Sequence, residues 1–414
     1  MGGIKIARKR RTKQLLAAAA IIAICAASIV IYRQSNPVEL KDVPEHRLQK
    51  LTRGVNLSGW FWSHYDPWAY DSDKLQSIRD MGFLHVRLPF NSTSFYNGND
   101  PAAINPVMLK RLDQAIENIL SHDLAVVLDY HAEDGLKAWI QLDPLHAEKT
   151  ALFWESLAKH MSRFDPDLVF LEVLNEPYAD DPQDWYDSQK TIMAAMRRGA
   201  PEHTLIASAN LQTGLAEDST DGIHKRWNSS LALTMMEPLK DRNVVYNFHM
   251  YDPMTFTHQE AGWGWEMQKY IKDVPYPLPD GASCPAARES SVMSPEEATI
   301  VQATLDQYCR EGWNKDKVRE YLKPVVDWAR SHDVPLTANE FGVYRAAEQI
   351  SRLSYIRDVR EAFEEFGIGW TLWDYQTDFG VAPNGIPDRG DIEALGLQPV
   401  PGFWESTADA EVKP

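Results

Sequence analysis

Residues Val169–Pro177 have the sequence VFLEVLNEP, an apolar run typical of a buried β-strand that ends in the polar residues Asn175 and Glu176. Similar runs recur along the chain, with helix-period stretches such as Glu148–Phe164 between them. Apolar strands that alternate with helices are typical of a parallel sheet covered by helices. The eight runs are Gly54–Gly59, His85–Phe90, Ala125–His131, Val169–Pro177, Leu205–Ala209, Val244–Pro253, Pro335–Gly342 and Ile368–Tyr375.

Eight strand–helix repeats predict the α/β class and a (β/α)8 (TIM) barrel within residues 51–405. An open, doubly wound sheet is the alternative, but no Gly-x-Gly-x-x-Gly motif follows the first strand to favour a dinucleotide-binding fold. We therefore expect a single domain, with a long excursion after the sixth strand at Phe256–Trp313 and a short C-terminal tail at residues 406–414.

The N-terminus has the composition of a targeting segment. Residues 1–14 are basic, and Leu15–Tyr32 form an apolar run that reaches the lower length limit for a transmembrane helix. The basic flank predicts a cytoplasmic end, so we expect a membrane anchor at residues 15–32, a linker at residues 33–50 and export of all that follows to the periplasm or exterior. A cleaved signal peptide, with small residues at Cys25–Ala27, is the alternative and would give a secreted protein.

The overall composition, with 44% hydrophobic and 24% charged residues, is that of a globular protein and excludes a many-pass membrane protein. The formal net charge of −17 repels phosphate backbones and polyuronates, so we expect no nucleic-acid partner and a neutral ligand. Cys284 and Cys309 are the only cysteines after the N-terminal segment. In an oxidising compartment they are expected to form a disulfide, and two separate buried thiols are the alternative.

Polar residues stand at the carboxyl ends of the predicted strands, where (β/α)8 barrels form their active sites. Glu176 ends the fourth strand and Glu340 the seventh, so their carboxylates are expected to face each other across the barrel mouth. Retaining glycoside hydrolysis needs two carboxylates about 5–5.5 Å apart, one protonated to release the alcohol and one ionised to attack the anomeric carbon. The other candidate site residues are Arg87, His131, Asn175, His249, Tyr251 and Trp373.

The types of these residues suggest their roles. A cation such as Arg87 and a phenol donor such as Tyr251 would keep Glu340 ionised. The negative charge on Glu340 would then help to keep Glu176 protonated. Asn175 can hold the 2-hydroxyl of the substrate sugar, a contact that strengthens in the transition state.

Aromatic and histidine side chains complete the predicted site. His131 and His249 would orient sugar hydroxyls or tune the acid, and Trp373 would give the sugar a flat apolar surface, although each could also be an ordinary core residue. Glu172, in mid-strand, is expected to pair with an arginine lining the barrel. Five further tryptophans could bind sugar or simply pack: Trp60, Trp62, Trp68, Trp263 and Trp265.

A metal-dependent hydrolase is an alternative, because Asp129 and Glu133 flank His131 and could join His249 around an ion. No His-Glu-x-x-His or comparable ligand spacing is present, so no metal and no cofactor are expected.

Taken together, these motifs resemble those of glycoside hydrolase family 5, the cellulase family. Asn175-Glu176-Pro177 and Asn339-Glu340-Phe341-Gly342 are similar to its two signatures. The resemblance implies that Glu176 is the acid/base and Glu340 the nucleophile. Asn339 is a departure, since Gly or Ser is more usual before the nucleophile, and the long segment Phe256–Trp313 is another. Further matching elements are Arg53–Leu57, Arg87, His131, His249-x-Tyr251, Trp373 and Ala394–Leu397, and the site residues among them correspond to those of the family.

The sequence therefore predicts a retaining glycosidase that acts on β-linked polysaccharides or oligosaccharides, foremost an endo-β-1,4-glucanase. An endo-β-mannanase or a β-1,3/1,6-glucanase is the alternative within the family, because sugar and linkage preference depend on loop geometry. A non-catalytic carbohydrate-binding protein is a rival from another class, but both Glu176 and Glu340 are present. The expected partners are the saccharide and, through the N-terminal segment, a membrane.

Overall fold

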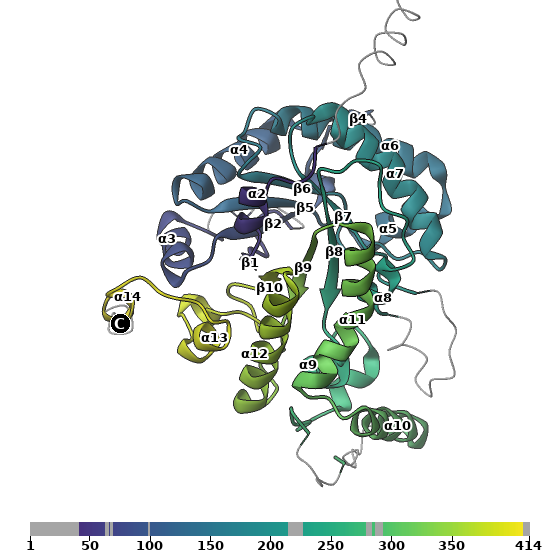
Figure 1. Ribbon diagram of the computed structural model, residues 1–414, viewed down its shortest axis with the longest axis vertical. Coiled ribbons are helices and arrows are strands. Elements are labelled where there is room, and N and C mark those ends of the chain that lie inside the picture. The colour runs from purple at the N-terminus through teal and green to yellow at the C-terminus, as the bar shows by residue number, and fades with distance from the viewer. Residues whose placement is uncertain are drawn as a thin grey trace, which may run out of the picture. The chain divides into compact units, whose positions relative to one another are not determined.

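The computed structural model describes residues 41–62, 66, 69–97, 100–213, 227–278, 284–285 and 293–408. Eight parallel strands close into a barrel in the order β1-β10-β9-β8-β7-β6-β5-β2 (Figure 1). Each strand overlaps one of the eight predicted runs, which confirms the predicted barrel. The strands are β1 (Arg53–Asn56), β2 (His85–Phe90), β5 (Ala125–Tyr130), β6 (Val169–Glu172), β7 (Leu205–Ser208), β8 (Val244–Met250), β9 (Leu336–Phe341) and β10 (Gly369–Leu372).

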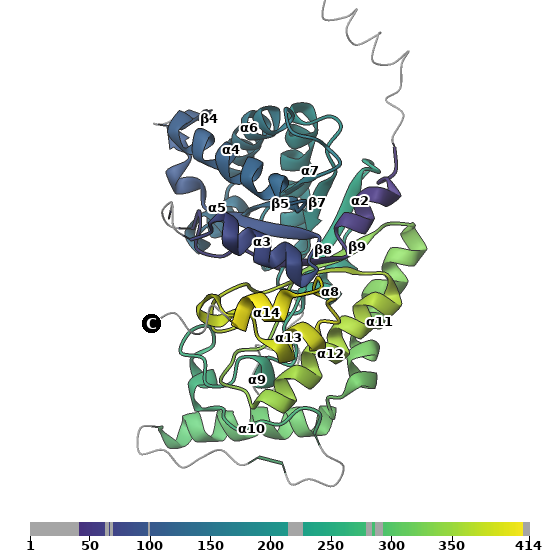
Figure 2. The ribbon, with the colours of Figure 1, turned by 90° about the vertical axis from the view of Figure 1, so that its left-hand side faces the viewer.

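Helices lie around the strands, and several begin at a polar residue that caps them (Figures 1 and 2). Asp143, for example, accepts a 2.9 Å hydrogen bond from the backbone N–H of Leu145 at the start of α6. The outer helices are α3 (Ser72–Met81), α4 (Pro106–Ser121), α6 (Pro144–Met161), α7 (Pro182–Gly199), α11 (Lys315–His332) and α12 (Gln349–Phe366). Shorter elements are α5 (Asp134–Leu142), α8 (Ser229–Leu233), α13 (Arg389–Ala394), α14 (Phe403–Ala408), the 3-10 turns η1 (Ser92–Ser94) and η3 (Pro383–Gly385), and the hairpin of β3 (Tyr96–Asn97) and β4 (Asp100–Ile104).

The predicted linker at residues 33–50 is wrong at its C-terminal end, because helix α2 (Glu45–Lys50) is part of the barrel. Arg47 of α2 is buried and donates 2.7 Å hydrogen bonds to Asp167 Oδ1 and to the carbonyl of Glu202. Leu48 packs against an apolar cluster at the amino ends of the strands. The helix therefore covers the amino ends of the barrel strands. Its polar sequence does not indicate this role, because few of its side chains face inward. The cluster contains Leu51, Ala125, Val127, Phe170, Ile206 and Val245.

The excursion between β8 and β9 has more regular structure than its composition suggests. It contains α9 (Met254–Thr257), the 3-10 turn η2 (Glu266–Tyr270) and the long helix α10 (Pro295–Glu311), which begins with a capping box (Figure 2). Cys284 and Cys309 are joined in a disulfide, as predicted, and this bond ties the segment at Cys284 to α10 within the excursion.

Within the part of the chain that the structure describes, no helix combines the length and the apolar character needed to cross a membrane. The predicted basic segment at residues 1–14, the predicted anchor at residues 15–32, the first part of the predicted linker and the tail from residue 409 lie outside the described residues.

His85, in β2, makes the stability of the fold depend on pH. Its ring lies against Gly54, where an added Cβ would be 2.1 Å from Nε2. Its Nδ1 is 3.0 Å from the carbonyl of Lys50 and its Nε2 is 2.8 Å from Thr371 Oγ1. Burial lowers the pKa of His85 from 6.5 to about 4, against a smaller opposing effect of the Lys50 carbonyl. The imidazole is therefore neutral in the folded barrel over the range in which it becomes charged in the unfolded chain.

We expect the free energy of unfolding to fall as the pH decreases from 7 to 4, because the unfolded chain then binds a proton at His85 that the folded chain does not. This single group should account for about 3 kcal/mol of the loss. Urea titrations of the wild type and of His85→Gln at both pH values measure it. The variant should lose correspondingly less stability over this interval, and equal losses in both chains would contradict the prediction.

Candidate active site

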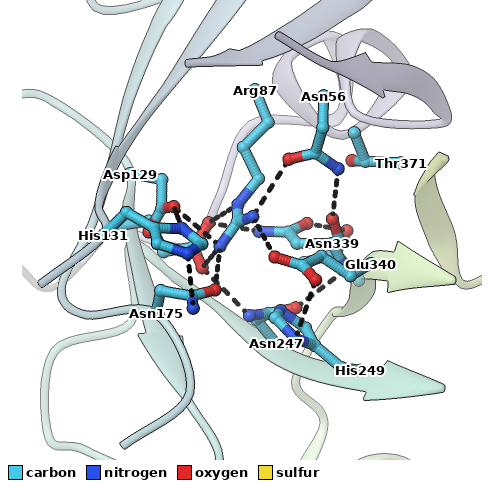
Figure 3. Close-up of polar contacts among 12 residues, drawn as sticks. Asn56, Arg87, Asp129, His131, Asn175, Asn247, His249, Asn339, Glu340 and Thr371 are labelled. Carbon is cyan, nitrogen blue, oxygen red and sulfur yellow. Dashed lines mark hydrogen bonds and ion pairs between the residues drawn. The ribbon is translucent and has the colours of Figure 1, made fainter. Parts of the chain in front are cut away.

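The predicted site residues meet at the carboxyl ends of the strands, around a cleft of about 290 Å³. Figure 3 shows five of them, Arg87, His131, Asn175, His249 and Glu340. Arg87 and Asn175 lie beneath the cleft floor and are buried. Glu176, four residues after the end of β6, has a φ of +41°, a left-handed conformation that is strained for a residue with a side chain. Such strain is often retained where a side chain must be aimed at a site. The predicted residues that line the cleft are His131, Glu176, His249, Tyr251, Glu340 and Trp373.

The two glutamates converge on His249. The Nδ1 atom of His249 is 3.0 Å from Glu176 Oε1 and 3.7 Å from Glu340 Oε2. One carboxylate oxygen of each glutamate and this nitrogen all lie within 4.8 Å of one another. The two carboxylates are therefore close enough to act on the same atom of a ligand. These three groups could also hold a metal ion. They share only His249 with the set considered from the sequence, which was Asp129, His131, Glu133 and His249.

Glu340 is surrounded by donors. Arg87 Nη1 donates to its Oε1 at 2.7 Å, and the Tyr251 hydroxyl donates to its Oε2 at 2.9 Å. Burial first, and then the charge of Glu340, raise the pKa of Tyr251 well above its usual value, so the phenol keeps its proton. The structure therefore brings to Glu340 the cation and the phenol donor that the sequence suggested for it.

Arg87 is the centre of a fully buried polar network (Figure 3). Its Nε and Nη2 form a forked ion pair with Glu172, at 2.8 and 2.9 Å. Arg87 is therefore the arginine that Glu172 was expected to pair with. Nη2 also donates to Asn175 Oδ1 at 2.9 Å and lies 3.0 Å from Asp129 Oδ2. Burial lowers the pKa of Arg87, but the three carboxylates around it raise this pKa by a larger amount. The net direction is up, so the guanidinium stays charged. One cation thereby holds residues from several strands in place.

Asn339, the departure before the proposed nucleophile, has a structural reason. Its Nδ2 donates to Glu172 Oε2 at 2.6 Å, and its Oδ1 accepts from Thr337 Oγ1 at 2.8 Å. Asn247 completes the contact by accepting from the Asn339 backbone N–H at 2.9 Å and donating to Glu172 Oε1 at 3.1 Å. A residue without a side-chain amide would remove one of the two donors to Glu172 Oε2, the other being Arg87 Nε.

Replacement of Glu172 by alanine should lower the free energy of unfolding by about 3–5 kcal/mol, because it leaves the charge of Arg87 buried without its forked partner. Urea unfolding measures this. Glu155→Ala is the matched control, since Glu155 pairs with Arg198 at 2.6 Å but both side chains are exposed. The control should lose less than about 1 kcal/mol. Equal losses in the two variants would show that burial of the pair is not what matters.

Glu176 and His249 share one proton. Burial raises the pKa of Glu176, but the hydrogen bond and charge of His249 lower it more, so the net direction is down. Burial lowers the pKa of His249, but the charges of Glu340 and Glu176 raise it, so the net direction is up. Both directions favour the pair in which Glu176 is ionised and His249 carries the proton. The sequence predicted that the charge of Glu340 would help to keep Glu176 protonated and that His249 would orient sugar hydroxyls or tune the acid. In the structure His249 acts against the first effect, because its hydrogen bond and charge lower the pKa of Glu176.

Aromatic side chains that line the cleft fall into two groups of ring contacts. Trp62 lies 4.7 Å from the His131 ring and 5.8 Å from the Trp373 ring, measured between centroids. Trp263 lies 4.8 Å from the Tyr344 ring and is half exposed. Both Trp62 and Trp263 line the cleft. Among the other tryptophans singled out in the sequence, Trp60 packs against Phe61 and Tyr70, Trp265 is partly buried against the core, and Trp68 lies outside the described residues.

Several contributors were not predicted. Ser229, at the start of α8, lines the cleft and exchanges hydrogen bonds with the backbone of His249, at 2.9 and 3.0 Å. Trp227 and Phe379 also line the cleft. No local motif marks these residues, because each follows an ordinary loop sequence and reaches the site only through the closure of the barrel.

Comparison with known proteins gives a consistent result. A family model described as Cellulase (glycosyl hydrolase family 5) matches residues 37–378. Endoglucanase 3 of Fibrobacter succinogenes is 25% identical over 89% of this chain, which spans only 56% of the length of that relative. Endoglucanase C of Acetivibrio thermocellus is 26% identical over 78% of this chain and 90% of its own length. The solved structure of endoglucanase Cel5A from Thermotoga maritima shares the fold, with a TM-score of 0.68 and 23% identity over 85% of this chain and 99% of that one.

Proposed function

We propose that this chain, which belongs to glycosyl hydrolase family 5, is an O-glycosyl hydrolase that cleaves β-linked glucans internally and with retention, as an endo-β-1,4-glucanase. The observation that carries the proposal is the approach of Glu176 and Glu340 to within 4.8 Å, oxygen to oxygen. Retaining glycosidases hold their two carboxyl groups about 5–5.5 Å apart, whereas inverting enzymes hold them about 6.5–9.5 Å apart to admit a water.

In the first step, Glu340 attacks the anomeric carbon and the bond from that carbon to the leaving oxygen breaks. Glu176 gives a proton to the leaving oxygen, which departs as an alcohol. Bound sugar excludes water from the cleft and makes the His249–Glu176 ion pair less stable, so the proton moves to Glu176 along their 3.0 Å hydrogen bond. Arg87 and Tyr251 hold the Glu340 carboxylate in place until it attacks.

In the second step, a water replaces the alcohol and gives its proton to Glu176. The resulting hydroxide attacks the anomeric carbon from the face that the alcohol left, and Glu340 is released as a carboxylate. The negative charge of Glu340 is absent while the covalent intermediate exists, which favours the ionised form of Glu176 when it must act as a base. Two inversions at one carbon give net retention.

Internal cleavage fits the two groups of aromatic residues that line the cleft. Trp62 and Trp373 can stack on one sugar ring and Trp263 on another, so that a chain can lie across the glutamates rather than end at them. The Endoglucanase names of the two curated relatives support the same substrate class.

The deciding experiment combines products and stereochemistry. Purified β-1,4-glucan, β-mannan and β-1,3/1,6-glucan are digested in parallel, and the lengths of the first products are measured. We expect the highest rate on β-1,4-glucan, a mixture of short oligosaccharides and the β-anomer as the first product seen by proton NMR. A higher rate on mannan would replace the glucanase assignment with a mannanase. An initial α-anomer would overturn retention, and no turnover of any of them would favour the binding-protein alternative.

We further propose that the protein works outside the cytoplasm, anchored by its N-terminal segment. The Cys284–Cys309 disulfide supports an oxidising compartment. The basic and apolar composition of residues 1–32 supports an anchor rather than a freely secreted form. Cells that express the full chain should hold the activity in their membranes and expose it to added protease. Active enzyme free in the medium, with its N-terminus near Ala27, would overturn the anchor.

A further inference from the structure

Asp129 lies under the cleft and touches the site through His131. Its side chain is fully buried, and its Oδ2 is 2.9 Å from His131 Nδ1 and 3.0 Å from Arg87 Nη2. On the opposite edge of the His131 ring, Nε2 is 3.2 Å from Asn175 Nδ2. Figure 3 shows these four side chains side by side. The Asp129 carboxylate, the imidazole and the amide therefore form a continuous chain of contacts.

The direction of every hydrogen bond in this chain follows from Arg87. A guanidinium can only donate, so the Asn175 atom 2.9 Å from its Nη2 must be the amide oxygen. The amide nitrogen of Asn175 then faces His131 and donates to Nε2, which must carry a lone pair. The proton of a neutral His131 is consequently on Nδ1, and it points at the Asp129 carboxylate.

Burial keeps His131 neutral. It lowers the pKa of His131 from 6.5 to about 3, and the charges of Lys137 and Arg87 act in the same direction against those of Glu340 and Glu176. The opposite neutral tautomer would set two donors against each other at Nε2 and two acceptors against each other at Nδ1. The contacts on both sides of the ring thus select one tautomer.

We propose that Asp129 is a positioning residue, which holds His131 in the Nδ1–H tautomer and thereby fixes the Asn175 amide for the 2-hydroxyl of the bound sugar. The inference rests on the proposed function for the role of Asn175. One N–H of the Asn175 amide is used by His131, and the other remains for the sugar. Asp129 acts on the reaction only through these two side chains.

Asp129→Asn tests this directly. The new amide can accept from Arg87 with its oxygen, and its nitrogen then donates to His131 Nδ1. That reverses the tautomer and sets an Nε2–H against the Asn175 N–H. We expect kcat to fall about 10- to 100-fold, the factor that one or two disrupted hydrogen bonds supply, with a change in KM of less than about threefold. On an aryl cellobioside that lacks the 2-hydroxyl in the reacting ring, the loss should largely disappear.

Long-range proton–nitrogen NMR of histidine-labelled protein reports the tautomer independently of activity. The wild-type His131 signals should show a proton on Nδ1, and Asp129→Asn should move it to Nε2. Asp113→Asn is the matched control, since Asp113 on α4 also bridges a histidine and an arginine. It lies 2.8 Å each from His160 on α6 and Arg163 in the turn after α6, and none of the three lines the cleft. The control should change neither kcat nor the His131 signals.

A wild-type His131 protonated on Nε2, or on both nitrogens, at neutral pH would overturn the inference whether or not the variant folds. An equal loss of kcat with and without the 2-hydroxyl would also overturn it. If the substrate proposal fails but His131 still changes tautomer in Asp129→Asn, the positioning of His131 stands and only the assignment of the sugar contact falls.

Discussion

Replacement of Glu340 by alanine should lower kcat about 10⁴- to 10⁶-fold while the barrel stays folded. No neighbouring group can replace the lost nucleophile. Tyr251 keeps its proton because burial raises its pKa well above the usual value, and Arg87 can only donate. The fold persists because Arg87 retains its pairs with Glu172 and Asp129. Turnover of an aryl β-cellobioside measures the effect, and circular dichroism checks the fold.

Azide provides the sharper test. In the cavity left by Glu340→Ala, azide should attack the anomeric carbon from the face that the carboxylate occupied and give an α-glycosyl azide. As a control, Glu155→Ala should leave kcat unchanged, because Glu155 is an exposed residue of α6 that pairs with the exposed Arg198 of α7. A Glu340→Ala variant that turns over near the wild-type rate, or whose azide product is the β-anomer, would refute the nucleophile assignment.

Replacement of Glu176 by glutamine should lower kcat on cello-oligosaccharides about 10²- to 10⁴-fold, the usual contribution of a general acid and base. An aryl cellobioside with a dinitrophenyl leaving group needs no proton, so its first step should be nearly unaffected and the glycosyl-enzyme should accumulate. The rate should no longer fall at high pH, because no acid remains to be deprotonated. Stopped-flow release of the phenol and mass spectrometry of the intact enzyme measure these changes.

The same variant should react with azide in the opposite stereochemical sense. Azide attacks the accumulated glycosyl-enzyme without help from a base, so Glu176→Gln should yield a β-glycosyl azide, in contrast to the α-anomer from Glu340→Ala. Identical products from the two variants would mean that one of the roles is misassigned. Equal losses of kcat on both kinds of leaving group would exclude Glu176 as the acid.

The barrel was predictable because each strand is a short apolar run and each long outer helix has its own periodicity and cap. The candidate site was predictable because the carboxyl ends of parallel strands converge, so residues such as His131 and Glu340 meet whatever lies between them in sequence. These inferences need only the order of elements, not the details of their pairing.

The features of the site that could not be predicted depend on the register in which strands far apart in the sequence pair. A register shift between Phe248 and His249 places His249 beside Glu340 in the β8–β9 pair, and no residue type announces it. The position of the acid's proton on His249 and the role of Asn339 both follow from that pairing. Helix α2 was missed for another reason, since its fixed position depends on acceptors more than a hundred residues away, including Asp167.

The position of α2 over the amino ends of the strands has a practical consequence for shortened forms of the enzyme. A chain trimmed to residue 51, the boundary that strand periodicity suggests, would uncover Phe170, Ile206 and Val245 to solvent and leave Asp167 without Arg47. Such a fragment would be prone to aggregate although every residue of the cleft is present. Recombinant versions that omit the N-terminal segment should therefore begin no later than Asp42, whose carboxylate pairs with Arg242 at 2.7 Å.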